Sequence, residues 1–209
     1  RVLVIDGERG NGKTTLLLTL LKLLGPEAEA IPVMGDSPLA WKHRDKTHCL
    51  LPVLDFDPLP HNMPVYGWLL APWLNVAKSA ARNAHLKEDL TESWHDLFDR
   101  AINGWTSVSV EGKPIVEKVL AFDDQITGWR EVRELWSKFV NRVVCAHEGC
   151  RDVGRCQQSH QRLFVVPIDD VDLQVEHVIG LLNAIRLFHH PNVAYMLTAD
   201  SEHIKFAFN

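Results

Sequence analysis

The sequence lacks several features that would assign it to a class of proteins at once. It holds four cysteines in 209 residues, too few for a disulfide scaffold, so a reducing cytosol is expected. It has no run of about 18 apolar residues and no visible signal-peptide pattern, so no membrane span is expected. Its net charge of -5 excludes a general attraction to nucleic acid or anionic membranes, although not a local basic patch. A cytoplasmic globular protein is expected.

The sequence does have a glycine-rich loop between an apolar strand and a helix. The strand begins at Val2 and the helix covers 15–24, and both are expected to be buried. The loop fits G-x-x-x-x-G-K-[ST], and its N–H groups together with a helix N-terminus make a cradle for phosphates. Lys13 is expected to carry charge to the β- and γ-phosphates, and Thr14 to offer its hydroxyl to Mg²⁺. The alternative is a strand-to-helix turn that binds nothing.

The residues expected to hold the nucleotide are Gly7, Gly10, Asn11, Gly12, Lys13, Thr14 and Thr15.

A second apolar strand, over 162–168, ends in adjacent carboxylates. Ligands bind beyond the carboxyl ends of parallel strands, so these side chains are expected near the loop. Asp169 suits Mg²⁺ coordination, through water, and Asp170 suits orienting and deprotonating an attacking water. Asp172 either assists or caps the next helix. An acidic helix start on the surface is the alternative interpretation.

A helix over 174–189 and a strand over 193–200 follow. Polar residues end this strand, and Thr198 or Asp200 is in a position to sense the γ-phosphate or the lytic water. The alternative is a cap for a helix that begins near Ser201. The predicted catalytic residues are Lys13, Asp170 and Thr198.

The rest of the chain is predicted to surround this core. A strand over 48–57 contains Pro52, which indicates an edge position. Residues 61–160 show mainly helical patterns, so the predicted division is a first core segment over 1–60, a helical insertion over 61–160 and a second core segment over 161–209. Both ends look cut, and a longer protein is expected.

Three cysteines and a histidine are close together in the sequence near the end of the insertion. Cys145, Cys150, Cys156 and His160 could hold a structural Zn²⁺, but the spacing C-x4-C-x5-C-x3-H is not a standard one. Buried thiols without a metal are the alternative.

The loop over 7–14 resembles a Walker A motif, and Ile168 to Asp172 resembles a Walker B motif in which a second aspartate replaces the catalytic glutamate. The run over 165–204 resembles KAP-type and STAND-type P-loop ATPases, which are related to the AAA+ group. The segment over 51–58 is similar to the second-strand region of large ATPases in bacterial anti-phage systems, including RADAR-type ATPases that work with an adenosine deaminase. Strands and motifs of about 80 residues carry these resemblances.

The resemblance implies an α/β P-loop NTPase core with a parallel sheet ordered 5-1-4-3-2, whose fifth strand lies outside the chain. It also implies a homo-oligomer, with a ring as one form, and an effector enzyme such as an adenosine deaminase as partner. The function expected is Mg²⁺-dependent ATP binding and hydrolysis that changes the shape or assembly of the oligomer. The rival is an ATP-dependent switch or scaffold with little turnover, and a small-molecule kinase is a weaker third.

Overall fold

The structure is a computed structural model, and it describes residues 1–24, 48–57, 65–81, 84–103, 115–149 and 162–208. Its strands are β1 (Val2–Asp6), β2 (His48–Leu50), β3 (Leu54–Asp55), β4 (Leu163–Asp169) and β5 (Val193–Ala199). Its helices are α1 (Lys13–Leu24), α2 (Val65–Ala80), α3 (Ala84–Asn103), α4 (Ile115–Glu148), α5 (Val175–Leu187) and α6 (Ser201–Phe208), with a short 3₁₀ turn, η2 (Val171–Leu173).

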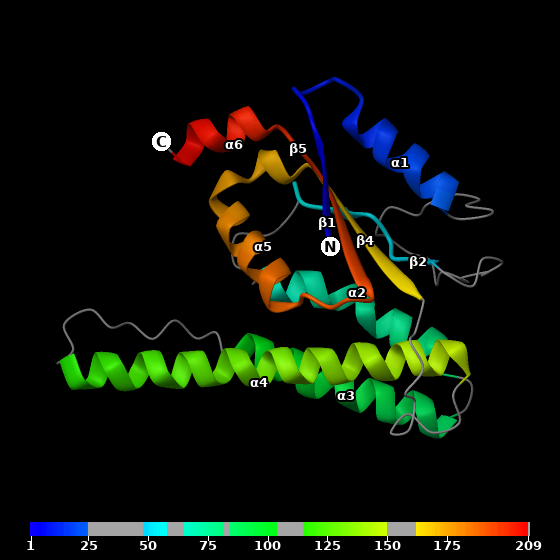
Figure 1. The fold of residues 1–209 in the computed structure, drawn as a ribbon, viewed down its shortest axis with the longest axis vertical. Coiled ribbons are helices and arrows are strands. Elements are labelled where there is room, and N and C mark those ends of the chain that lie inside the picture. The colour runs from blue at the N-terminus through cyan, green and yellow to red at the C-terminus, as the bar shows by residue number, and fades with distance from the viewer. Residues whose placement is uncertain (25–47, 58–64, 82–83, 104–114, 150–161, 209) are drawn as a thin grey trace. The chain divides into compact units, whose positions relative to one another are not determined.

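The five strands form one parallel sheet (Figure 1). Its order is β1-β5-β4-β2, and β3 also pairs with β4. β5 therefore lies between the strand that precedes the glycine-rich loop and the strand that ends at Asp169. This is the 1-4-3-2 part of the predicted order, so the α/β fold class and the placement of these strands are confirmed. Parallel sheets require both faces to be covered, which is why β4 and β5 are apolar along almost their whole length.

The predicted strand over 48–57 is divided into β2 and β3, which both pair with β4 at the edge of the sheet. Residues 51–53 separate them, although the N–H of Leu51 still donates to the carbonyl of Val165 at 2.9 Å. Pro52 has no N–H to donate, so a break at this point of an edge strand follows from its chemistry.

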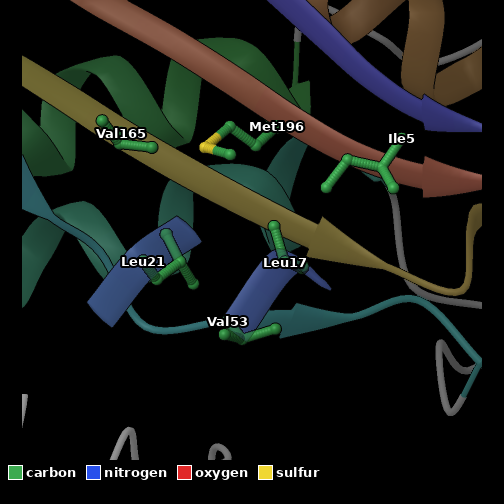
Figure 2. Packing of buried hydrophobic residues seen from close by; sticks show 6 residues of the cluster. All are labelled: Ile5, Leu17, Leu21, Val53, Val165 and Met196. Atoms are coloured by element: carbon green, nitrogen blue, oxygen red, sulfur yellow. The ribbon is translucent and has the colours of Figure 1, made fainter. Parts of the chain in front are cut away.

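One core of this sheet lies between α1 and the strands (Figure 2). Leu17 and Leu21 of α1 are fully buried, and they pack with residues from three strands and from the β2–β3 connection. The cluster consists of Ile5, Leu17, Leu21, Val53, Val165 and Met196. It fixes α1 against the sheet, and the glycine-rich loop lies at the N-terminal end of that helix.

Two expectations of burial are met only in part by the described residues. Val2, Leu3 and Val4 are each 51% exposed, because β1 is at an edge of the described sheet. α1 buries only a narrow stripe, and Leu16 and Leu23 are exposed although the helix is apolar nearly all round. Apolar composition alone does not tell how many faces of an element are covered.

The chain divides into two compact units, one of residues 1–72 and 157–209 and one of residues 73–156. The predicted boundaries after residues 60 and 160 lie outside the described residues. In the second unit, the helices pack around aromatic side chains, with the rings of Trp73 and Trp136 edge to face at 4.8 Å. Among the described helices, none has both the length and the apolar character needed to cross a bilayer.

Candidate nucleotide site

The glycine-rich loop leaves the end of β1 and enters α1 in a tightly turned path. The N–H of Gly7 extends the β1–β5 ladder by donating to Ala199 at 3.2 Å, and the N–H of Asn11 closes a turn on the carbonyl of Glu8. Gly10 and Gly12 have φ of 88° and 75°, where a side chain costs about 1–2 kcal/mol. The loop therefore depends on glycine at these positions.

Lys13 is a buried charged group at the end of the loop. It is 8% exposed, and its Nζ donates to the carbonyls of Gly7 at 2.7 Å and Glu8 at 3.3 Å. The ammonium group is thus held inside the curve of its own loop. The first N–H groups of a helix have no acceptor within the helix, and the N-terminus carries a partial positive charge, so an anion beside Lys13, Thr14 and Thr15 would be stabilised.

The carboxyl end of β4 holds the second group of predicted residues. Asp169 is 6% exposed and Thr198 is fully buried, and the Thr198 hydroxyl donates to Oδ1 of Asp169. The N–H of Asp170 donates to Thr198 Oγ1 at 2.9 Å and to Asp169 Oδ1 at 3.1 Å. The structure thus brings Asp169, Asp170 and Thr198 together in one network.

Asp170 has an unusual backbone and an unusual charge environment. Its φ and ψ are 56° and 39°, the left-handed region, which Asp and Asn tolerate better than other side chains. Burial and the carboxylates of Asp169, Asp55, Asp172 and Asp57 raise the pKa of Asp170. A raised pKa brings a carboxylate closer to the range in which it accepts a proton efficiently.

Topology relates these two groups of residues. β1 and β4 are separated only by β5, and strands lie about 4.8 Å apart, so the ends of β1 and β4 are about 10 Å apart. A bound phosphate chain and its ion fit in such an interval. Asp6 of β1 and Asp169 of β4 lie at the same end of the parallel sheet.

For Asp200 and Asp172, the structure shows which residue caps a helix. Oδ1 of Asp200 accepts the N–H groups of Glu202 and His203, both at 3.1 Å, so Asp200 caps α6. Asp172 lies inside η2, 3% exposed, and the N-cap of α5 is Gln174. Asp172 therefore does not cap the next helix.

Some residues of this edge were not singled out from the sequence. Asp55 is aligned with Asp169 across the β3–β4 pair, and Asp57 adds charge beside Asp170. The amide of Gln174 donates to the carbonyl of Asp57. The position of Asp55 at the carboxyl end of a predicted strand was a usable signal, whereas nothing in the sequence indicated the reach of Gln174.

A second unforeseen contact joins the end of β1 to α6. The carboxylate of Asp6 accepts the N–H of Ser201 at 2.9 Å and its hydroxyl at 2.6 Å, and these bonds lower the pKa of Asp6. The last residue of β1 is thereby joined to the first residue of α6.

The donor set fits Mg·ATP. Thr14 would supply a hydroxyl and Asp169 a carboxylate, and Mg²⁺ in such sites takes one or two protein oxygens and completes its shell with phosphates and water. In the part of the chain that the structure describes, no three His, Cys, Asp or Glu side chains form a ready cage for a metal ion. An ion that arrives with its phosphates does not need one.

The predicted zinc ligands lie mostly beyond what the structure describes. Cys145 is a buried thiol within α4, 2% exposed. Cys150, Cys156 and His160 lie outside the described residues.

Comparison with known families gives a match that agrees with this geometry. Residues 131–209 match the profile of the KAP family P-loop domain, a span that contains β4, η2, α5, β5 and α6 but not the glycine-rich loop. A comparison with curated proteins gave no match. The matched span and the glycine-rich loop meet in one sheet, which supports nucleotide binding. Over residues 131–209 the chain is therefore similar to the KAP family P-loop domain.

Proposed function

We propose that the chain binds Mg·ATP at the glycine-rich loop and hydrolyses it. The observation that carries this proposal is the network of Asp169, Thr198 and Asp170 at the same sheet edge as Lys13. Lys13 would neutralise phosphate charge, and Thr14 and Asp169 would hold the ion, which supplies charge stabilisation for the transferred phosphoryl group. Thr198 orients Asp169 and the Asp170 amide from inside the sheet.

Asp170 is the proposed base for the attacking water. The four carboxylates around it favour proton uptake, which supports hydrolysis over an ATP-dependent switch that needs only the cradle. Steady-state phosphate release by the wild type and by Asp170→Asn separates the two. Release by the wild type at least about 100-fold faster than by the variant, with equal ATP affinity, supports hydrolysis. ATP binding with equally slow release in both proteins leaves the switch or scaffold.

The resemblance to anti-phage ATPases leads us to propose a homo-oligomer, with a ring as one form, whose shape or assembly responds to ATP. An effector enzyme such as an adenosine deaminase is the proposed partner. Light scattering of the protein with and without a non-hydrolysable ATP analogue tests the first part. A monomer under both conditions contradicts it.

Structural zinc at Cys145, Cys150, Cys156 and His160 is a separate proposal. Metal analysis of the purified protein tests it, and a zinc content near zero removes it.

A further inference from the structure

Hydrogen bonds join the turn that carries Asp170 to the residues at the carboxyl end of β3. The N–H of Phe56 donates to the carbonyl of Asp169 at 3.1 Å, and the amide of Gln174 donates to the carbonyl of Asp57. Between them, the N–H of Leu173 donates to the carbonyl of Asp170 at 3.1 Å. The segment over 55–57 is therefore hydrogen-bonded to Asp169, which precedes Asp170 in the chain, and to Gln174, which follows it.

This segment also contacts the start of α2. The ring of Phe56 is fully buried and meets the ring of Trp68 edge to face at 5.3 Å. Trp68 is 6% exposed, so both rings are confined by packing. A displacement of this part of α2 must move Phe56, because close-packed interiors transmit small shifts.

α2 contains a point at which it can bend. Pro72 lies inside the helix and cannot donate to the carbonyl four residues earlier, which is that of Trp68. The division of the chain into two compact units falls directly after Pro72, so the second half of α2 belongs to the other unit. Helices kink at proline in preference to other positions. Pro72, the boundary between the two units and the residue Trp68 thus lie within five residues of one another.

We propose that Gln174 is a positioning residue for Asp170, and that residues 55–57, which it holds, couple α2 to the Asp169–Asp170 turn. The inference rests on the proposed function, since it concerns the residue assigned to water activation. The amide of Gln174 keeps the turn in the left-handed geometry of Asp170, and motion of α2 at Pro72 reaches the turn through Trp68 and Phe56.

Gln174→Met tests the positioning role, because it keeps the length of the side chain and removes the donor. Turnover is expected to fall about 10- to 100-fold, with KM for ATP unchanged within about twofold, since misplacement of a reacting group by about 1 Å costs this much. Arg186→Met is the matched control, an exposed polar residue on α5 about 18 Å further along the helix. It should leave turnover unchanged. Wild-type turnover in Gln174→Met refutes the positioning role.

The coupling is measured by Trp68 emission, isolated as the difference between each protein and its Trp68→Phe counterpart. Mg·ATP should change this emission in the wild type but not in Gln174→Met, although both bind ATP in a filter assay. ATP binding with no change in Trp68 emission in the wild type, or the full change in Gln174→Met, overturns the coupling alone. Failure of the wild type to bind ATP, with Lys13→Ala behaving the same, overturns the proposed function and the coupling with it.

Discussion

Substitution of Asp170 separates two costs that the native aspartate combines. One is the left-handed backbone at φ 56°, and the other is a carboxylate among four others. Asn and Ala are both neutral, but Asn tolerates left-handed geometry and Ala does not, so their difference reports the backbone. Asp and Asn share that tolerance, so their difference reports the charge.

The backbone difference can be given a size. A left-handed alanine costs about 1–2 kcal/mol, so Asp170→Ala should unfold at lower temperature than Asp170→Asn. In a chain of this length, 1 kcal/mol shifts Tm by about 2–4 °C, so a gap of about 2–8 °C is expected. The N–H bonds to Thr198 and Asp169 survive in both variants because they belong to the backbone.

The charge difference has a definite sign. The raised pKa of Asp170 means that its contribution to stability is present below the unfolded value near 3.8 and is lost as pH rises through the folded pKa. Asp170→Asn should therefore be more stable than the wild type at pH 7, and the gain should shrink as the pH is lowered towards 4. Asp170→Asn should also lose turnover. The wild-type aspartate would then support activity while lowering the stability of the fold.

Asp57 offers the matched control for these variants. It belongs to the same acidic edge and is exposed, but it is not among the residues with positive φ. Thermal unfolding of Asp57→Ala and Asp57→Asn should differ by less than about 0.5 kcal/mol. Equal stability of Asp170→Ala and Asp170→Asn at pH 7 would refute the argument from backbone geometry.

Three other predictions concern separate parts of the chain. Lys13→Ala should abolish ATP binding or turnover and leave the circular dichroism spectrum unchanged, because the lysine serves phosphates and not the core; unchanged ATP affinity contradicts the site. Burial lowers the pKa of His190 to about 4, so stability should be complete above the unfolded value of 6.5 and should fall by up to about 3 kcal/mol between pH 6.5 and 4. His190→Asn keeps an acceptor for the N–H of Asn192 and should flatten this dependence in denaturant titrations; an unchanged slope removes His190 as its cause. Tyr195→Phe deletes a buried hydroxyl that donates to the carbonyl of Phe188 at 3.0 Å, and it should cost about 1 kcal/mol in urea unfolding, whereas the exposed control Ile179→Val should cost less.

Much of the sheet and of the site could be predicted because local rules act on them directly. The glycine spacing before Lys13 fixes a loop, and the apolar runs before Asp169 and Thr198 fix strands whose carboxyl ends meet at one edge. Pro52 indicated an edge strand because a missing N–H is a property of one residue. In each of these cases the physical cause lies within a few residues of the observed feature.

Other features could not be predicted because they depend on distant partners. The left-handed turn at Asp170 arises where β4 meets η2, and the bond from Gln174 to Asp57 joins residues that are 117 positions apart. The exposure of Val2 to Val4 depends on which strand lies beside β1, and an apolar pattern looks the same for a central strand and an edge strand. Tertiary context decides such cases.

The carbonyls that hold Lys13 change what phosphate binding means in this protein. The ammonium group already has acceptors at Gly7 and Glu8, so a phosphate must replace partners that are already present. The contribution of Lys13 to affinity is then a difference between two sets of oxygens, smaller than its charge alone would suggest. If a phosphate replaced both carbonyls, the exchange would release them from Lys13. Nucleotide binding would then change the contacts at the end of β1 before any bond in the nucleotide is broken.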